Sequence, residues 1–264
     1  MMMLRSIKIQ IVFFIMFLKM TASYGWAGVM PSDAIINQLN TGDIILEIEV
    51  SLDSMVIARV SQGLYSHIGL VYKDKDNRVM VLESYPNKGI VQHDLRSFIF
   101  PSRSRIFRLC ILQFKETDRS KLQEVLDAFM QYSANVKFDL ELNFDDNIPT
   151  LEDLATGQFN YYCTEMVNMS FQMAYGRNYI KWPNYYDVVY NHIKTQPAFY
   201  ERYAAFYFQH KYLRMMKFMD SILNMERKVL LTPSGILESP HFNVIFVGED
   251  LSNIPKELKV FIEV

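Results

Sequence analysis

One of the two cysteines in this chain stands where a helix should begin. Apolar residues after Cys163 recur at about the spacing of one helix face, at Met166, Val167, Phe171 and Ala174. Gly176 is a suitable stop for such a helix. Unpaired backbone N–H groups and the positive end of the helix dipole favour thiolate over thiol at a helix start. Cys163 is therefore a candidate nucleophile, and the alternative is a small buried hydrophobic residue.

A histidine and a glutamate lie on two predicted strands that a charged turn connects. His67 falls in the apolar run 65–72 and Glu83 in the run 78–84. If the turn centres on Lys75, His67 lies directly opposite Glu83, and opposed residues of an antiparallel pair share one face. A carboxylate beside an imidazole orients the ring and supports its charged form. The alternatives are a core histidine and a solvated glutamate.

A second histidine follows the next predicted strand, at residues 89–91. We expect His93 on a polar surface, and the alternative is a substitute group that orients His67. Cys110 lies inside the apolar strand pattern 105–112 and is expected to be an inert core residue, while Cys163 should be reactive. A Cys110–Cys163 disulfide is the alternative that an exported chain would allow.

The elements that must position these residues alternate between strand and helix patterns. Further strands are expected at 44–48 and near 242–247, and helices from residue 33, at 55–61 with Ser54 as cap, at 120–132, and in a long aromatic tract at about 185–230. The tract would cover 185–193 and 198–230. It packs against the sheet in the simplest interpretation. The acidic connector 137–146 is expected to be a solvated loop, since its spacing matches no EF-hand.

The first 27 residues have the pattern of a secretory signal. Arg5 and Lys8 form a basic region, and an apolar core of about ten residues follows, which is too short to span a bilayer. Gly25 and Ala27 suit cleavage before Gly28, and Thr21 with Ser23 offers a competing site. We therefore expect an exported protein, periplasmic or secreted.

The charge balance of the remaining chain argues against a nucleic-acid partner. The whole chain has 27 bases and 29 acids. The signal segment contains three of the bases and none of the acids, so 24 bases and 29 acids remain, a net charge of −5. Nucleic-acid binding calls for a clustered basic surface. No further stretch approaches a transmembrane span, and no repeat or low-complexity linker divides the chain, so residues 28–264 are expected to form a single domain.

Four short motifs in a fixed order resemble one protein family. They are Gly42-Asp43-Ile44-Ile45, Tyr65-Ser66-His67-Ile68-Gly69-Leu70-Val71, Leu82-Glu83, and Tyr162-Cys163-Thr164-Glu165-Met166-Val167. This order, with histidine ahead of cysteine, is similar to the permuted papain-like amidases of the YaeF/YiiX type, within the NlpC-like cysteine hydrolases. Phe138-Asp139 and Thr232-Pro233-Ser234 also fit. The likeness extends from about residue 40 to 245.

This resemblance implies an α+β, circularly permuted papain-like (NlpC-type) fold. An antiparallel sheet would pack on helices, with the helical tract as an addition that is longer than expected. The resemblance also implies Cys163 as nucleophile, His67 as general base and Glu83 as orienting group, with no metal and no cofactor. One departure is Thr164, where the family commonly has serine.

The implied activity is hydrolysis of an amide bond by an exported cysteine hydrolase. A small amide or peptide, peptidoglycan-derived or an N-acyl amino acid, would be the substrate. The N–H of Cys163 is a natural oxyanion donor, and Tyr65 and Tyr162 are candidates for substrate binding. One alternative is a lipid acyltransferase or thioesterase of the lecithin:retinol acyltransferase-like type, with the aromatic tract as acyl channel. Others are a non-catalytic envelope binding module, and a zinc site of Cys, His and Glu that would lack closely spaced ligand pairs.

Overall fold

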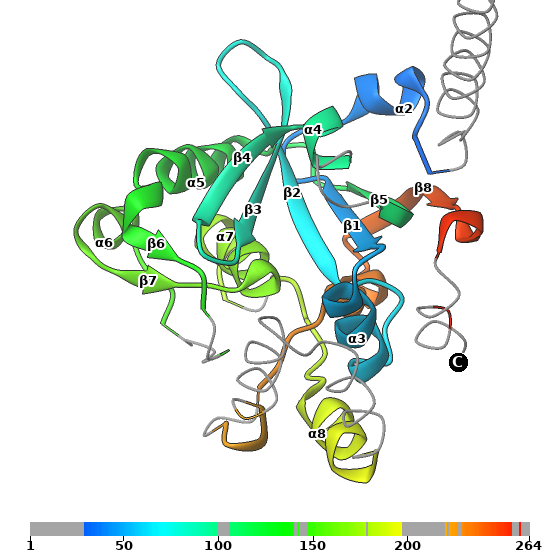
Figure 1. Cartoon of the computed structure of the whole chain (residues 1–264). Coiled ribbons are helices and arrows are strands. Elements are labelled where there is room, and N and C mark those ends of the chain that lie inside the picture. Colours follow the sequence, from blue (N-terminus) through cyan, green and yellow to red (C-terminus); the bar gives the residue numbers. More distant parts are fainter. Residues whose placement is uncertain are drawn as a thin grey trace, which may run out of the picture.

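The core of the molecule is an antiparallel sheet of six strands (Figure 1). This computed structural model describes residues 29–99, 106–139, 142, 147–177, 179–196, 220, 222–225, 229–254 and 259. The strands are β1 (Ile44–Glu49), β2 (His67–Lys73), β3 (Val79–Tyr85), β4 (Gly89–Asp94), β5 (Ile106–Phe114) and β8 (Phe242–Glu249). They lie in the order β4-β3-β2-β1-β5-β8. The predicted signal segment, residues 1–27, lies outside the described residues.

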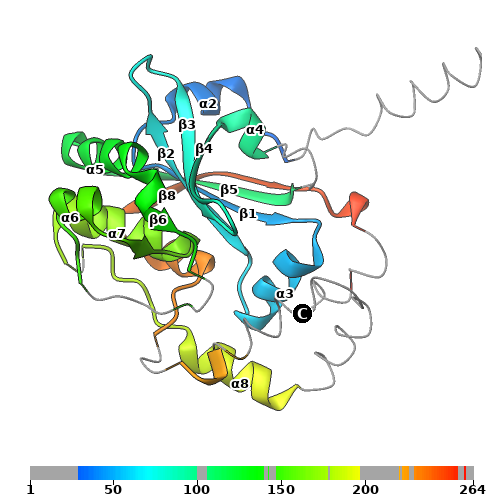
Figure 2. The same ribbon diagram turned by 60° about the vertical axis from the view of Figure 1, so that its left-hand side comes forward.

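Helices cover both faces of this sheet (Figure 2). They are α2 (Asp33–Gln38), α3 (Leu52–Val60), α4 (Leu95–Ile99), α5 (Ser120–Gln131), α6 (Leu151–Thr156), α7 (Cys163–Tyr175) and α8 (Tyr186–Thr195). Short 3-10 turns occupy Ser133–Asn135, Pro233–Glu238 and Leu251–Asn253. A small parallel pair, β6 (Val136–Lys137) and β7 (Phe159–Asn160), leads into α7. The expected α+β arrangement, an antiparallel sheet packed on helices, is thus confirmed.

The alternation of side chains along the strands produces two hydrophobic layers. Ile44 and Leu46 of β1 belong to the layer that packs against α5 and α7. Ile45, between them, belongs to the opposite layer, together with Val71 of β2 and Phe98 of α4. Both faces are therefore buried, which explains why these strands read as almost continuous apolar runs. A polar residue within such a strand therefore lies either among apolar side chains or at a functional site.

Two predicted elements differ from the structure in their limits. The cap of α3 is Ser51, whose side chain accepts from the N–H of Ser54, so the helix begins earlier than expected. In the aromatic tract, α8 is helical as expected, and most of the second half lies outside the described residues. Its described end is not helical at Val229 and Leu230, where the prediction had helix.

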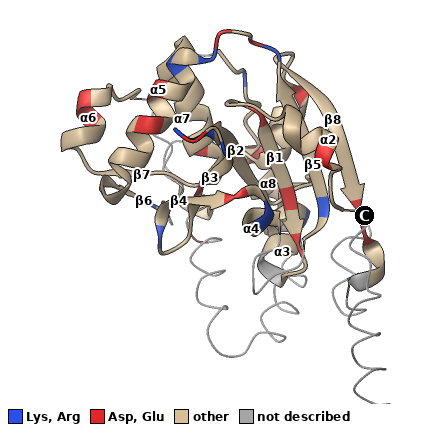
Figure 3. Ribbon diagram, turned by 90° about the horizontal axis from the view of Figure 1, so that it is seen from above, with Lys and Arg blue, Asp and Glu red and all other residues tan. Residues whose placement is uncertain are grey.

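Charged residues of both signs are interspersed over the described ribbon (Figure 3). Among the described residues, no helix combines the length and the apolar character that crossing a membrane requires. The absence of a nucleic-acid partner rests on the charge balance of the sequence and stays a prediction.

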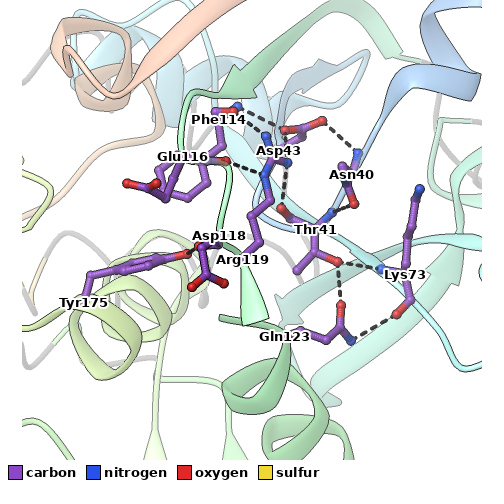
Figure 4. A network of polar contacts seen from close by, with 10 residues as sticks. All are labelled: Asn40, Thr41, Asp43, Lys73, Phe114, Glu116, Asp118, Arg119, Gln123 and Tyr175. Carbon is purple, nitrogen blue, oxygen red and sulfur yellow. Dashed lines mark hydrogen bonds and ion pairs between the residues drawn. The ribbon is translucent and has the colours of Figure 1, made fainter. Parts of the chain in front are cut away.

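A buried ion pair fixes the start of β1 to β5 and α5 (Figure 4). Asp43 is fully buried, and its carboxylate accepts from Arg119 Nη1 at 2.8 Å, from the backbone N–H of Phe114 at 3.0 Å and from that of Asn40 at 2.9 Å. The guanidinium also donates to the carbonyl oxygen of Thr41 at 2.8 Å. The Gly-Asp motif therefore has a structural role at the start of β1.

Replacing Arg119 by methionine is expected to cost about 3–5 kcal/mol of unfolding free energy, because it leaves the Asp43 carboxylate buried without its cation. Urea unfolding followed by circular dichroism measures this loss. The matched control is Arg96→Ala, which removes an exposed partner of Asp33. That control should leave the unfolding midpoint almost unchanged. Equal midpoints for both variants would show that the buried pair contributes nothing.

Candidate active site

Cys163 is the first residue of α7, as the sequence predicts. Tyr162 is the N-cap in extended conformation, and the helix ends at Tyr175 with Gly176 as C-cap at φ 97°. That positive φ favours glycine, which explains the stop. The thiol is half-buried. The first N–H groups of a helix have no acceptor within it, so the backbone N–H of Cys163 is available to a ligand.

His67 and Glu83 are brought together, although the predicted register is wrong. The β2–β3 ladder pairs Leu70 with Leu82 and Val71 with Val81, so the turn centres on Asp76 instead of Lys75. In this register Glu83 lies diagonally from His67, two residues away from the predicted position. A shift of two residues keeps both side chains on one face, and diagonal neighbours remain within reach of long side chains. His67 Nε2 contacts Glu83 Oε2.

The turn chemistry explains the shifted register. Asp74 Oδ1 accepts from the N–H groups of Asp76 and Arg78, each at 2.9 Å, and Asn77 adopts φ 58°. Aspartate commonly closes such side-chain turns and asparagine tolerates positive φ. These two residues were the signal in the sequence that could have placed the turn one residue later.

The thiol, the imidazole and the carboxylate form one continuous chain of contacts. The Cys163 thiol lies within hydrogen-bonding range of the His67 ring. Burial alone would raise the pKa of the Cys163 thiol, but the charge of His67, the bond to its ring and a contact with Thr164 Oγ1 at 3.8 Å hold it below the usual value. Burial opposes the charge on His67 too, yet the negative charges of Cys163 and Glu83 raise its pKa well above 6.5. The lowered pKa of Cys163 and the raised pKa of His67 both favour a thiolate–imidazolium pair.

The contacts also assign the two ring nitrogens of His67. The pKa of Glu83 is lowered to about 2, because the charge of His67 and hydrogen bonds from His67 and His93 outweigh its burial. An ionised carboxylate only accepts, so His67 Nε2 carries a proton and donates it to Glu83. Nδ1 is then the nitrogen left for the thiol. The ring is further held by Phe98, which stacks on it at 6.2 Å, and by the edge of Tyr85 at 6.5 Å.

A second buried glutamate lies beside His67 and was not predicted. Glu47 of β1 is directly opposite His67 of β2, is only 4% exposed, and its Oε2 has no hydrogen-bond partner. Burial, aided by nearby acids, raises the pKa of its carboxyl well above 4.5. Glu47 and Glu83 thus flank one imidazole, and the pKa values of their carboxyl groups are shifted in opposite directions. A glutamate inside the run Ile44–Ile48 was the available signal, since a buried acid is rare without a reason.

His93 differs from the predicted surface position. Its Nε2 lies 3.0 Å from Glu83 Oε1, so the carboxylate has one oxygen on each imidazole. The alternative interpretation, a role as orienting group, placed this residue closer to its observed position. The long-range pairing of β4 with β3, in which His93 lies opposite Val81, could not be derived from the sequence alone.

The two tyrosines expected to bind substrate lie in the core. Tyr65 is 3% exposed and its hydroxyl bonds the Cys110 sulfur. Tyr162 is 4% exposed, and its hydroxyl oxygen accepts from the N–H of Leu231 at 3.1 Å. These positions give no support to direct substrate contact. Cys110 and Cys163 are both free, so the disulfide alternative is wrong.

The Thr-Pro-Ser motif of the sequence also has a structural role near the site. Ser234 Oγ accepts from the N–H groups of Leu64 and Tyr65, at 2.8 and 3.1 Å. Both residues lie in the segment that leads into β2. The serine therefore fixes the approach to His67 across a long stretch of sequence.

A thiol at a helix start, met by an imidazole from a preceding sheet, defines the class of permuted papain-like cysteine hydrolases. The family model described as permuted papain-like amidase enzyme, YaeF/YiiX, C92 family, matches residues 38–246. The chain therefore belongs to this family of cysteine amidases and peptidases. Comparison with curated proteins gives no match.

One similar solved structure supports the fold. It is described as the metalloprotein yiiX from Escherichia coli O157:H7, with 16% identity, a TM-score of 0.52, and coverage of 81% of this chain and 98% of that chain. In the described part of the present chain, no three His, Cys, Asp or Glu side chains converge in a way that could hold a metal ion. We therefore derive no step through a metal.

Replacing Glu83 by glutamine should narrow the pH range of activity. The amide keeps an acceptor for His67 Nε2–H, but the negative charge that raises the pKa of His67 is gone. The pKa of His67 should fall and that of Cys163 should rise, so the alkaline limb moves to lower pH and the acid limb to higher pH. The pH profile of kcat/KM measures both limbs. An unchanged profile would show that the Glu83 charge does not support the imidazolium.

Proposed function

We propose that the protein is an exported thiol amidase with Cys163 as nucleophile, His67 as general base and acid, and Glu83 as the group that orients the imidazole. The observation that carries this proposal is the unbroken contact chain from the Cys163 thiol through His67 to Glu83. Cys163 is the first residue of α7, so the helix dipole favours its thiolate. The backbone N–H of Cys163 can donate to the oxyanion. A binding module would not require all three groups in contact.

The reaction follows from these positions. The Cys163 thiolate attacks the amide carbonyl carbon, a C–S bond forms, and the backbone N–H of Cys163 donates to the oxyanion. His67 then gives its Nδ1 proton to the leaving nitrogen as the C–N bond breaks, which yields a thioester and an amine. Water attacks the thioester and gives a proton to His67, and the acid product leaves with Cys163 restored. Glu83 holds the ring throughout by accepting from Nε2.

We propose small amides as substrates, either peptidoglycan-derived peptides or N-acyl amino acids, and an extracytoplasmic location. The location rests on the basic and apolar pattern of residues 1–27. Export predicts that the mature chain begins at Gly28. Mass spectrometry of the protein isolated from the producing cell's envelope and medium tests this, and a full-length chain confined to the cytosol would contradict it.

A substrate panel tests the chemistry. Purified protein is incubated with stem peptides, N-acyl amino acids, and short- and long-chain acyl thioesters, and both amine release and intact protein mass are followed. We expect amine release together with an acyl adduct that peptide mapping places on Cys163. Long-chain adducts in preference to amide cleavage would favour the lipid acyltransferase alternative, whose predicted acyl channel lies largely outside the described residues. Binding without any adduct or turnover would favour the non-catalytic module.

A further inference from the structure

We propose that His93 is a positioning residue, which holds the Glu83 carboxylate in the orientation that serves His67. The proposal rests on the thiol mechanism above and adds a fourth member to it. Glu83 is almost fully buried, with a side-chain exposure of 6%, and its two oxygens are divided between two imidazoles. His93 Nε2 lies 3.0 Å from Oε1, while Oε2 faces His67.

The proton positions follow from the carboxylate. Since ionised Glu83 can only accept, Nε2 of His93 must carry a proton, and the neutral ring in that tautomer already supplies it. His93 therefore does not need to be charged to act. Its side chain is 32% exposed, and its Nε2 faces Glu83. The contact with His93 is made by Oε1, and Oε2 is the oxygen that faces His67.

The strand geometry explains why a second donor is useful. Glu83 is diagonal to His67 instead of directly opposite, so its side chain must lean along the strand to reach the ring. A carboxylate has several rotamers, and a second fixed donor selects the one that reaches His67. His93 is suitably placed, because on β4 it is diagonal to Glu83 from the other side, opposite Val81. The sheet thus holds the carboxylate between β2 and β4.

The acid and basic groups around this carboxylate determine any pH readout. They come from several elements: Glu47 and Glu49 on β1, His67 on β2, Tyr85 on β3, His93 on β4 and Cys163 on α7. Removing His93 leaves all the others in place. A change in the titration of Cys163 in a His93 variant therefore reports on the orientation of Glu83.

The test compares His93→Leu, which cannot donate, with His93→Gln, whose amide can. Steady-state kinetics and the pH dependence of Cys163 alkylation by iodoacetamide are measured for both. We expect His93→Leu to lower kcat on the order of tenfold with KM unchanged, and to move the alkylation inflection of Cys163 upward. His93→Gln should have a kcat and a Cys163 alkylation inflection close to those of the wild type. The matched control is Gln92→Leu, the neighbouring residue on the opposite face of β4, opposite Leu82, which should behave like wild type.

A double variant tests whether His93 acts through Glu83. If His93 acts through Glu83, then His93→Leu should have less than a twofold further effect in the Glu83→Gln protein. An equal effect in both backgrounds, or no effect of His93→Leu in the wild type, would overturn the positioning role. Wild-type protein whose Cys163 titrates as an ordinary thiol would overturn the proposed function, and the role of His93 with it. If the alkylation inflection of wild-type Cys163 lies below that of an ordinary thiol but His93→Leu does not move it, only the role of His93 would be overturned.

Discussion

Replacing Cys163 by alanine is expected to abolish turnover and every covalent acyl adduct. No other side chain in the described site can form the thioester, because Cys110 lies in the apolar layer of β5, 1% exposed, and burial raises its pKa to about 11. Rates should fall to the uncatalysed background, as they do when a covalent nucleophile is removed. Intact mass after incubation with the cleaved substrate, together with the rate of amine release, measures the effect.

Cys110→Ala is the matched control for this experiment. It removes the other thiol and loses only the hydroxyl contact from Tyr65, so the site should stay active unless the core is weakened. Circular dichroism and the unfolding midpoint show whether any loss of activity comes from a weakened core. Residual adduct formation in Cys163→Ala, at a rate near that of wild type, would show that another group carries the chemistry.

Replacing His67 by alanine should lower kcat/KM by about 10²–10⁴-fold, the range that a positioned general base supplies. The loss has two parts, because His67 both keeps Cys163 ionised and protonates the leaving nitrogen. The charge of His67 is the main factor that offsets the burial of the Cys163 thiol, so the variant should recover partly as pH rises and the thiol ionises by itself. Rates measured from neutral to alkaline pH test both parts.

The control for His67→Ala is His241→Ala. His241 stacks on Tyr179 at 4.5 Å and makes no contact with Cys163, so its loss should leave the rate near that of wild type. A His67→Ala protein that is folded and loses less than about tenfold would contradict the role of His67 as general base. Loss without any recovery at alkaline pH would show that proton transfer to the leaving group is the larger part.

The local parts of the site could be predicted from the sequence. Apolar spacing and Gly176 define α7, and with it the place of Cys163 at a helix start. The apolar run of β2 and the polar turn after it define the hairpin, and a register error of two residues still left His67 and Glu83 on one face. The face of the sheet on which a side chain lies is therefore predicted more reliably than the register, since a shift by two residues does not change the face.

The parts that could not be predicted depend on contacts between distant segments. Glu47 meets His67 only because β1 pairs with β2, and His93 meets Glu83 only because β4 pairs with β3. Periodicity describes each strand but not its neighbours. Tyr65 is a candidate for substrate binding in the sequence, yet its side chain lies in the layer that packs against α5 and α7, next to Cys110.

The pH dependence of Cys163 alkylation tests the central claim most directly, because it measures the thiolate without requiring a known substrate. Protein is exposed briefly to iodoacetamide at a series of pH values, and labelling of each cysteine is measured by peptide mapping. We expect that Cys163 is labelled with an inflection clearly below 9, that Cys110 stays unlabelled, and that His67→Ala moves the Cys163 inflection upward. An inflection of wild-type Cys163 at or above 9, unchanged in His67→Ala, would contradict it.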